Sequence, residues 1–222
     1  MELLIISGSQ REKSQSAKVA TYLSELTDLT SQFTQSEHIE LCKQSLPFWD
    51  GNDDTKFDLP SNWGEISQKL TNADALILIT PEWSSTASPL LKNLLMMCEA
   101  SETGHKPVLI ISVVSGISGA YPIAELRMNA FGNNKLVAIP DHLIIRNVES
   151  VLNTFNEAKT QKSLLPDYNI AEADISEPDQ HIRHRIGYSL HTLTHYATVL
   201  KKLRRSLSEH TYPDERLYDY SM

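Results

Sequence analysis

Three short segments are apolar along almost their whole length, and they constrain the fold more than any other feature of the sequence. They read ELLIIS at residues 2–7, ALILIT at residues 75–80 and PVLIISVV at residues 107–114. A strand that is apolar at consecutive positions is buried on both faces, so helices must cover both sides of its sheet. This pattern is typical of parallel sheets, in which helices connect neighbouring strands.

The segments between these strands have the spacing of amphipathic helices. Val19, Leu23 and Leu26, for example, recur every three or four positions. Helices are expected at residues 14–29, 63–72, 88–99 and 120–131. Further strands are expected at residues 38–43 and from residues 136–139, and a loop at residues 44–61. The alternation of strand and helix predicts an α/β fold, a doubly wound parallel sheet with helices on both faces.

The carboxyl-terminal third has a different pattern. Residues 181–207 carry a continuous apolar stripe, which predicts a helix of about seven turns. Its first half is expected to cover the sheet, and its second half to extend toward another subunit. Residues 150–180 are polar and indicate a connector. We therefore expect one domain at residues 1–207, followed by a tail at residues 208–222.

The long helix also carries histidines and basic residues. His184, His191 and His195 share one face, and the last two have a spacing found in metal sites. We favour a solvated or interface face, with no metal, because no carboxylate or cysteine accompanies them. The basic residues indicate either contact with an acidic surface, such as that of a partner subunit, or a solvated helix end. They are Arg183, Arg185, Lys201, Lys202, Arg204 and Arg205.

Composition and charge argue against several classes of protein. Lys and Arg total 20 against 28 Asp and Glu, so the net charge is −8, which argues against nucleic acid as a partner. No segment approaches the ~18 uninterrupted apolar residues of a membrane span. Cys42 and Cys98 form no Cys-x-x-Cys pair and are expected to be reduced. These features predict a cytoplasmic protein that binds neither nucleic acid nor membrane.

The first candidate site segment is SGSQREKSQS at residues 7–16. In a doubly wound sheet, ligands bind beyond the carboxyl ends of the strands, so the loops that follow strands are informative. Here four serines and Arg11 precede a predicted helix. Hydroxyls, a guanidinium and free amides at a helix N-terminus together favour a phosphate. A serine-capped turn without a ligand explains this loop equally well.

Two other loops lie at the same predicted edge. PEWSSTAS follows the ALILIT strand and offers the Trp83 ring for stacking and the Ser84 hydroxyl. SGISGAY follows the PVLIISVV strand, and Gly116 and Gly119 there permit close approach of the backbone. A packed aromatic ring and an ordinary glycine turn are the alternatives for each loop alone. Together the three loops predict a cleft for a planar ring with a phosphate tail.

With these loops the sequence resembles the NADPH-dependent FMN reductase family, which has a flavodoxin-like fold. The resemblance covers roughly residues 1–150 and implies five parallel strands in the order 2-1-3-4-5, to which the apolar stripe at residues 181–207 adds an extended C-terminal helix. A G-S-x-R-x-x-S motif is matched by Gly8, Ser9, Arg11 and Ser14, and a P-E-Y-N motif is matched by residues 81–84. The helix that follows the second motif is matched by Leu91, Lys92 and Asn93. A leucine–proline–aspartate loop is matched by Leu46, Pro47 and Asp50, and a glycine-rich loop by residues 115–119.

The resemblance implies non-covalently bound FMN, with NADPH or NADH as co-substrate. Two electrons would pass to a small-molecule acceptor such as a quinone, free flavin, an azo dye or a metal oxyanion. It also implies a homodimer or homotetramer. The flavin would carry the chemistry, so no catalytic side chain is expected. The residues expected to bind the cofactor are Ser9, Arg11, Ser14, Gln15, Ser16, Pro81, Glu82, Trp83, Ser84, Ser115, Gly116, Ser118 and Gly119.

Four positions depart from the family pattern. Trp83 replaces a tyrosine and keeps a stacking face, whereas Ser84 replaces an asparagine whose amide can contact the ring. Ile117 and Ser118 stand where the family often has glycine, and Ile117 is expected to crowd the ring or narrow the substrate mouth. These departures keep two alternatives open. One is a flavin-binding or redox-sensing module without enzyme activity, and the other is a flavodoxin-like interaction domain that has lost its cofactor.

Overall fold

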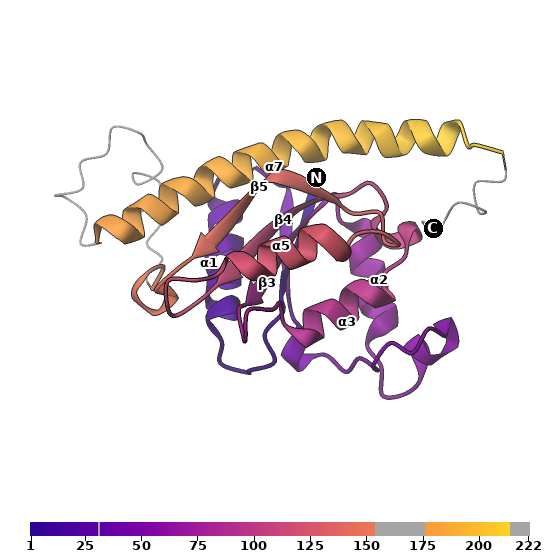
Figure 1. The fold of residues 1–222 in the computed structure, drawn as a ribbon. Coiled ribbons are helices and arrows are strands. Elements are labelled where there is room, and N and C mark those ends of the chain that lie inside the picture. The colour runs from indigo at the N-terminus through magenta and orange to yellow at the C-terminus, as the bar shows by residue number, and fades with distance from the viewer. Residues whose placement is uncertain (31, 154–175, 214–222) are drawn as a thin grey trace.

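The computed structural model describes residues 1–30, 32–153 and 176–213, and its centre is one five-stranded sheet (Figure 1). The strands are β1 (Glu2–Ser7), β2 (Gln35–Glu40), β3 (Ala75–Pro81), β4 (Pro107–Val113) and β5 (Val137–Ile145). All neighbouring strands are parallel, and their order is β2-β1-β3-β4-β5. This is the flavodoxin-like order, so the predicted fold class is confirmed.

The three apolar segments form the centre of the sheet, as predicted. Every residue of β3 and β4 is buried, and so is every residue of β1 except Glu2. Successive side chains of a strand point to opposite faces of the sheet. Ile5 and Ile77 therefore belong to one hydrophobic cluster, and Leu4 and Leu76 belong to the other.

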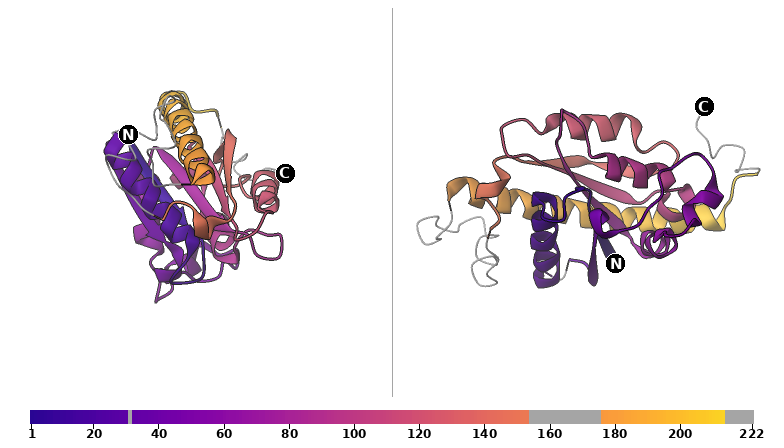
Figure 2. Two further views of the ribbon diagram at one scale, coloured as in Figure 1. Left: turned by 90° about the vertical axis from the view of Figure 1, so that its left-hand side faces the viewer. Right: turned by 90° about the horizontal axis from the view of Figure 1, so that it is seen from below.

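Helices cover both clusters. The helices are α1 (Gln15–Thr30), α2 (Trp63–Asn72), α3 (Pro89–Met97), α4 (Ala100–Thr103), α5 (Ala120–Asn129) and α7 (Glu177–Glu209). α1 and α7 pack on one face of the sheet, whereas α2, α3 and α5 pack on the other (Figure 2). Short 3-10 segments add η1 (Leu41–Lys43), η2 (Asp53–Phe57) and η3 (Val148–Ser150).

The element boundaries differ from the sequence prediction in several places. β2 lies three residues earlier than predicted, because it is an edge strand in which only Ile39 is buried, so it has little apolar signal. α3 ends at Met97 rather than at residue 99. α7 begins at Glu177, because the Ser176 hydroxyl caps it by accepting the Asp179 N–H at 3.4 Å. Most of the predicted connector, residues 154–175, lies outside the described residues, as do residues 214–222 of the predicted tail.

The basic end of α7 binds the chain's own acidic surface. Lys201 Nζ lies 2.7 Å from Asp74 Oδ2, and Arg204 Nη2 lies 3.1 Å from Asp74 Oδ1. Burial favours the neutral acid, but the hydrogen bond from Lys201 and the nearby charges lower the pKa of Asp74. The predicted contact between the basic helix end and an acidic group therefore forms within one subunit. Lys201 and Arg204 are bound to Asp74, so they do not face only solvent.

The remaining predictions for α7 concern its histidines. The His191 and His195 rings lie edge to face, with centroids 4.5 Å apart. Within residues 1–30, 32–153 and 176–213, no three His, Cys, Asp or Glu side chains are grouped to hold a metal ion. Over the same ranges, no helix is both long enough and apolar enough to span a bilayer.

Candidate functional site

The loop from β1 to α1 is shaped by its glycine and serines. The Gly8 N–H donates to the Ile79 carbonyl oxygen at 2.8 Å, which holds the start of the loop against β3. The Ser9 hydroxyl accepts the Arg11 N–H at 3.1 Å and turns the chain. The Ser14 hydroxyl then accepts the backbone N–H three residues later, also at 3.1 Å. These contacts place the N-terminus of α1 at the carboxyl edge of the sheet.

The loop after β3 is a small hairpin that carries Trp83. Trp83 and Thr86 exchange backbone hydrogen bonds of 3.3 and 3.0 Å. Ser84 and Ser85 form the tip, with φ angles of 49° and 60°, as a tight hairpin turn requires. Glu125 of α5 anchors the base by accepting the Thr86 hydroxyl at 2.9 Å. Ser84 is therefore exposed at the tip and does not reach the cleft.

The loop from β4 to α5 is tied to β3 by a carboxylate. Glu82 Oε2 accepts the Gly119 N–H at 2.7 Å and also the Ser118 hydroxyl. Gly119 has φ 102°, and a Cβ there would lie 2.4 Å from Cγ2 of Ile144, so only glycine fits. Ile117 is 83% exposed and does not line the cleft. The expectation that Ile117 crowds the ring or narrows the substrate mouth therefore stays a prediction.

The three loops converge on one cleft of about 390 Å³ at the carboxyl edge of the sheet. Its volume lies in the usual range for small-molecule sites. Ser84, Ser118 and Gly119, which were expected in the site, lie outside its lining. The predicted residues that line it are Ser9, Arg11, Ser14, Gln15, Ser16, Pro81, Glu82, Trp83, Ser115 and Gly116.

A further wall of the cleft comes from a segment without a recognisable motif. η3 follows β5 and contributes Val148 and Glu149. Lys18 of α1 fixes this segment by donating to the carbonyl oxygens of Val148 and Val151 at 2.6 and 2.8 Å. Glu149 Oε1 accepts the Ser115 hydroxyl at 3.0 Å. The position of this segment after a strand was the signal that could have identified it. Lys13, Val113 and Val114 also line the cleft and were not predicted.

Arg11 and Trp83 connect the first two loops. The centre of the Arg11 guanidinium lies 5.2 Å from the centroid of the indole ring, which is a cation–π contact. No carboxylate of the described ranges lies within ion-pair distance of Arg11. Its charge is therefore available to an anion in the cleft.

Several lining residues carry buried oxygens that lack a partner within the chain. They are Gln15 Oε1, Ser16 Oγ and Glu82 Oε1. Buried polar atoms are normally hydrogen-bonded, so a ligand or a water molecule in the cleft would give these atoms a partner. The first turn of α1 also has backbone N–H groups that no helix can pair internally. The Ser16 hydroxyl and these N–H groups are donors that fit a phosphate, whereas the Gln15 and Glu82 oxygens are acceptors for other parts of a ligand. The indole face fits a planar ring, so the residues fit FMN.

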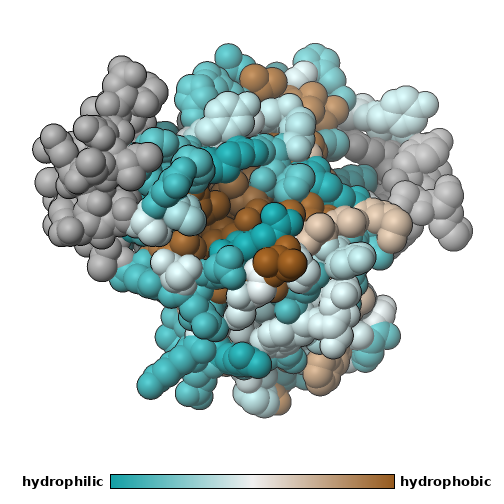
Figure 3. All heavy atoms as spheres, turned by 60° about the vertical axis from the view of Figure 1, so that its left-hand side comes forward, coloured by the Kyte–Doolittle hydropathy of each residue, from teal (hydrophilic) through white to brown (hydrophobic). Residues whose placement is uncertain are grey.

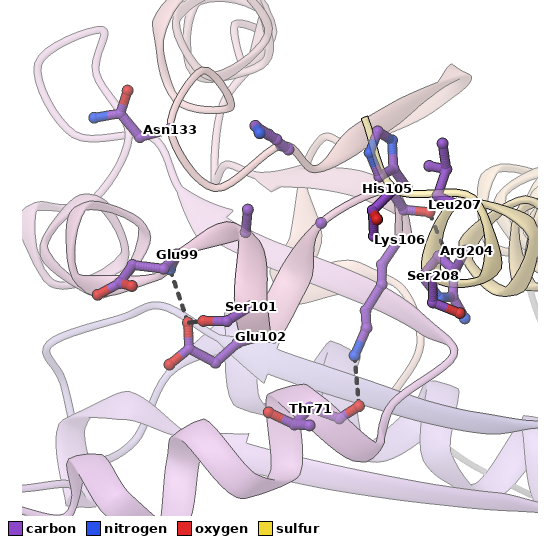
Figure 4. Close-up of a pocket in the computed structure, with 14 residues that line it drawn as sticks. Thr71, Glu99, Ser101, Glu102, His105, Lys106, Asn133, Arg204, Leu207 and Ser208 are labelled. Atoms are coloured by element: carbon purple, nitrogen blue, oxygen red, sulfur yellow. Dashed lines mark hydrogen bonds between the residues drawn. The ribbon is translucent and has the colours of Figure 1, made fainter. Parts of the chain in front are cut away.

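A larger cavity of about 590 Å³ lies at the opposite edge of the sheet, beside the end of α7 (Figure 4). Lys106 donates to the carbonyl oxygens of Leu70 and Thr71 at 2.6 and 2.7 Å. Arg204 is bound to Asp74. None of the partnerless buried oxygens of the described residues lines this cavity. Although this cavity is larger than the cleft, its described lining therefore presents no unpaired buried oxygen with which a ligand could form a hydrogen bond.

Lys106 makes the free energy of unfolding depend on pH in a way that can be tested. Burial, and then the charge of Arg204, lower the pKa of Lys106 to about 8, and Asp74 and Glu102 oppose the shift. In the unfolded chain the pKa returns to ~10.4. Between these values the unfolded state binds more protons, so stability rises with pH.

Urea unfolding of the wild type and of Lys106→Met at several pH values tests this expectation. From about pH 8 to ~10.4, the wild type should gain stability relative to the variant by at most ~1.4 kcal/mol per pH unit. A difference between the two proteins that does not change with pH would contradict it.

The chain is similar in sequence to known flavin-dependent enzymes. Residues 1–150 match the model of the NADPH-dependent FMN reductase family. An NADPH azoreductase of Bacillus sp. (strain OY1-2) is 28% identical over 145 residues, which are 65% of this chain and 76% of the relative. An FMN-dependent NADPH-azoreductase of Staphylococcus aureus (strain USA300) is 30% identical over 130 residues, which are 58% of this chain and 68% of the relative.

Similar solved structures have the same fold. The flavoenzyme NAD(P)H:(acceptor) oxidoreductase FerB of Paracoccus denitrificans has a TM-score of 0.61 at 17% identity, covering 89% of this chain and 97% of the other. The apo form of an NADH:FMN oxidoreductase, EMOB, has a TM-score of 0.60 at 17% identity, covering 87% and 88%. The family match supports the expected enzyme over the two non-enzymatic alternatives. The chain belongs to the NADPH-dependent FMN reductase family, and is thus an oxidoreductase with FMN as cofactor and NADPH as co-substrate.

Proposed function

We propose that the cleft between the three loops holds FMN and that the acceptor of the electrons is an aromatic azo compound. The observation that carries the proposal is the convergence of Arg11, Trp83 and Gly116 on one cleft. Bound FMN supplies two-electron transfer, and the protein supplies position and electrostatics. The choice of acceptor is supported by two relatives that are named azoreductases.

The phosphate end of the site is assigned to the first loop and α1. Arg11 contributes a guanidinium without an ion pair to any described carboxylate, and the N-terminus of α1 contributes backbone N–H groups. The partnerless Ser16 hydroxyl adds a further donor. Ser14 caps the helix through its own hydroxyl, so we assign it mainly a role in shaping the loop.

The ring end of the site is assigned to the second and third loops. Pro81 and Trp83 line one part of the cleft, and Ser115 and Gly116 line another. A Cβ at Gly116 would meet nothing within 4 Å, so this glycine leaves space for a ring. Glu82 holds the two loops together through its bonds to the third loop, which makes it a positioning residue.

The proposed function is tested with purified protein and a monoazo dye. The protein is expected to bind FMN and to decolourise the dye only when FMN and NADPH are both present. Each azo bond cleaved to two amines takes four electrons, so two molecules of NADPH should be consumed. FMN binding without loss of dye colour would contradict the acceptor, and no FMN binding would contradict the site.

Glu149 places a negative charge in the cleft and also acts electrostatically on Lys18 of α1, the helix assigned to the phosphate end, so its removal should strengthen phosphate binding. It lines the cleft and accepts the Ser115 hydroxyl. Glu149→Gln keeps an acceptor for that hydroxyl but removes the like charge. We expect FMN affinity to rise several-fold, with little change for riboflavin, which lacks the phosphate. Glu209→Gln at the exposed end of α7 is the control for net charge. Equal effects on FMN and riboflavin would contradict the assignment of the phosphate end.

We also propose that the protein forms a homodimer or homotetramer. Large apolar side chains are exposed on its surface, including Phe48 at 85%, Met96 at 55% and Met128 at 81%. Exposed apolar surface of this kind is common at contacts between subunits. Sedimentation equilibrium should give two or four times the chain mass of 25.0 kDa, and a single-chain mass at micromolar concentration would contradict the proposal.

A cytoplasmic location is proposed from the two thiols. Cys42 and Cys98 are both free, and Cys98 is buried. Burial raises the pKa of Cys98, so its thiol is protonated and unreactive. Free thiols suit a reducing compartment. We propose no nucleic acid and no membrane as partner.

A further inference from the structure

A second hollow lies beside the cleft, at the carboxyl end of the neighbouring strand. It has a volume of about 560 Å³ and lies between the end of β5 and the start of α7. The face drawn in Figure 3 has hydrophobic surface inside a hollow, with hydrophilic residues around it. We call this site the β5–α7 hollow. Its lining comprises Ile144, Ile145, Val151, Pro178 and Ile182 as apolar residues, and Arg146, Asn147, His181 and Arg185 as polar ones.

The cations of this hollow are not equivalent. Arg185 is held by Asp141 through both carboxylate oxygens, so its charge is already paired. Arg146 donates through Nε to the Ser118 carbonyl oxygen at 2.8 Å. No carboxylate in the described part of the chain lies within ion-pair distance of Arg146, and its side chain is exposed.

The hollow and the cleft share a wall. Ser118 belongs to the loop between β4 and α5, which also carries Ser115 and Gly116 of the cleft. Arg146 is bonded to this loop from the other side. β4 and β5 are neighbouring strands, and neighbouring strands lie ~4.8 Å apart. Residues 147–151 also separate the two sites, because Val148 and Glu149 line the cleft and Asn147 and Val151 line the hollow. A dinucleotide with its nicotinamide in the cleft can therefore place its adenosine end in the adjoining hollow.

We propose that the β5–α7 hollow binds the adenosine 2′-phosphate end of NADPH and that Arg146 binds the 2′-phosphate. The adenine would lie on the apolar surface of Pro178 and Ile182 at the start of α7, and the planar fork of Arg146 suits a phosphate. NADH lacks this phosphate, so Arg146 is a specificity-determining residue. The inference rests on the proposed position of the flavin in the adjacent cleft.

Steady-state kinetics of Arg146→Met with both nicotinamides test the proposal. The KM for NADPH should rise at least ~10-fold, because a charge-assisted contact is lost. The KM for NADH should change by less than about twofold, since NADH makes no such contact. Arg146→Lys should lie in between, because it keeps the charge and loses the fork. Arg205→Met, at the exposed far end of α7, is the matched control and should change neither KM.

A binding measurement without flavin separates this proposal from the proposed function. Calorimetric titration with adenosine 2′,5′-bisphosphate should show binding at least ~10-fold tighter than adenosine 5′-monophosphate, and Arg146→Met should abolish the difference. Retained preference in that variant, or equal rises of KM for NADPH and NADH, would overturn the proposal. If the protein prefers the bisphosphate but binds no FMN, the result would support the proposed 2′-phosphate site in the hollow and contradict the proposed FMN site in the cleft.

Discussion

Replacing Arg11 by alanine should weaken FMN binding by at least ~10-fold, because hydrogen bonds to charged groups contribute about 1.5–3 kcal/mol. The guanidinium lines the cleft and lies over the Trp83 ring. Riboflavin has the same ring without the phosphate, so its affinity should fall much less. Fluorescence titration of the flavin-free protein with both ligands measures the two dissociation constants.

Arg205→Ala is the control for this experiment, since Arg205 is exposed at the far end of α7. It makes the same change in net charge and should leave both affinities unchanged. The same loss of affinity for FMN and riboflavin in Arg11→Ala would show that Arg11 acts on the ring through Trp83. Unchanged FMN affinity would remove Arg11 from the site.

Replacing Gly119 by alanine should destabilise the protein by about 2–4 kcal/mol. The backbone at Gly119 has φ 102°, and an added Cβ would lie 2.4 Å from Ile144 Cγ2 and 3.2 Å from Val114 Cγ1. Ile144 belongs to β5, so relief of the overlap moves the loop away from the sheet. That movement also strains the hydrogen bond from the Gly119 N–H to Glu82.

The matched control is in the same loop. A Cβ at Gly116 would meet nothing within 4 Å, and its φ lies outside the left-handed region. Gly116→Ala should therefore change stability by less than ~0.5 kcal/mol. Urea unfolding of the two variants measures the contrast, and similar free energies of unfolding for both would contradict the geometry of this loop.

The central strands were predictable because burial on both faces leaves a direct mark on composition. β1 and β3 have almost no polar position, and a run of that kind allows few other structures. β2 is an edge strand with one buried residue, Ile39, so its boundaries had no comparable signal. The sequence thus predicts a strand best where both faces are covered.

The cleft was largely predictable for the same reason. Once the strands are known, the parallel topology brings their following loops to one edge, and Arg11, Trp83 and Gly116 do line one cleft. The roles of individual polar residues were harder to predict. Glu82 and Ser118 bind each other, because the nearest partner of a polar side chain depends on distances that spacing in the sequence does not give.

Two long-range features had no signal in the sequence. Glu149 reaches the cleft because Lys18 holds η3 through carbonyl oxygens. Every residue has a backbone carbonyl, so a contact of this kind cannot be recognised from the amino-acid sequence. The basic end of α7 binds Asp74, which lies 127 positions before Lys201. Pairing over such a separation is set by where the long helix crosses the sheet.

The crystal structure of the protein with FMN tests the central claim most directly. The phosphate should lie at the N-terminus of α1 beside Arg11 and Ser16, and the ring should lie between Trp83 and Gly116. Density for FMN in the cavity of about 590 Å³ beside Lys106, or side chains filling the cleft in a protein saturated with FMN, would contradict the account.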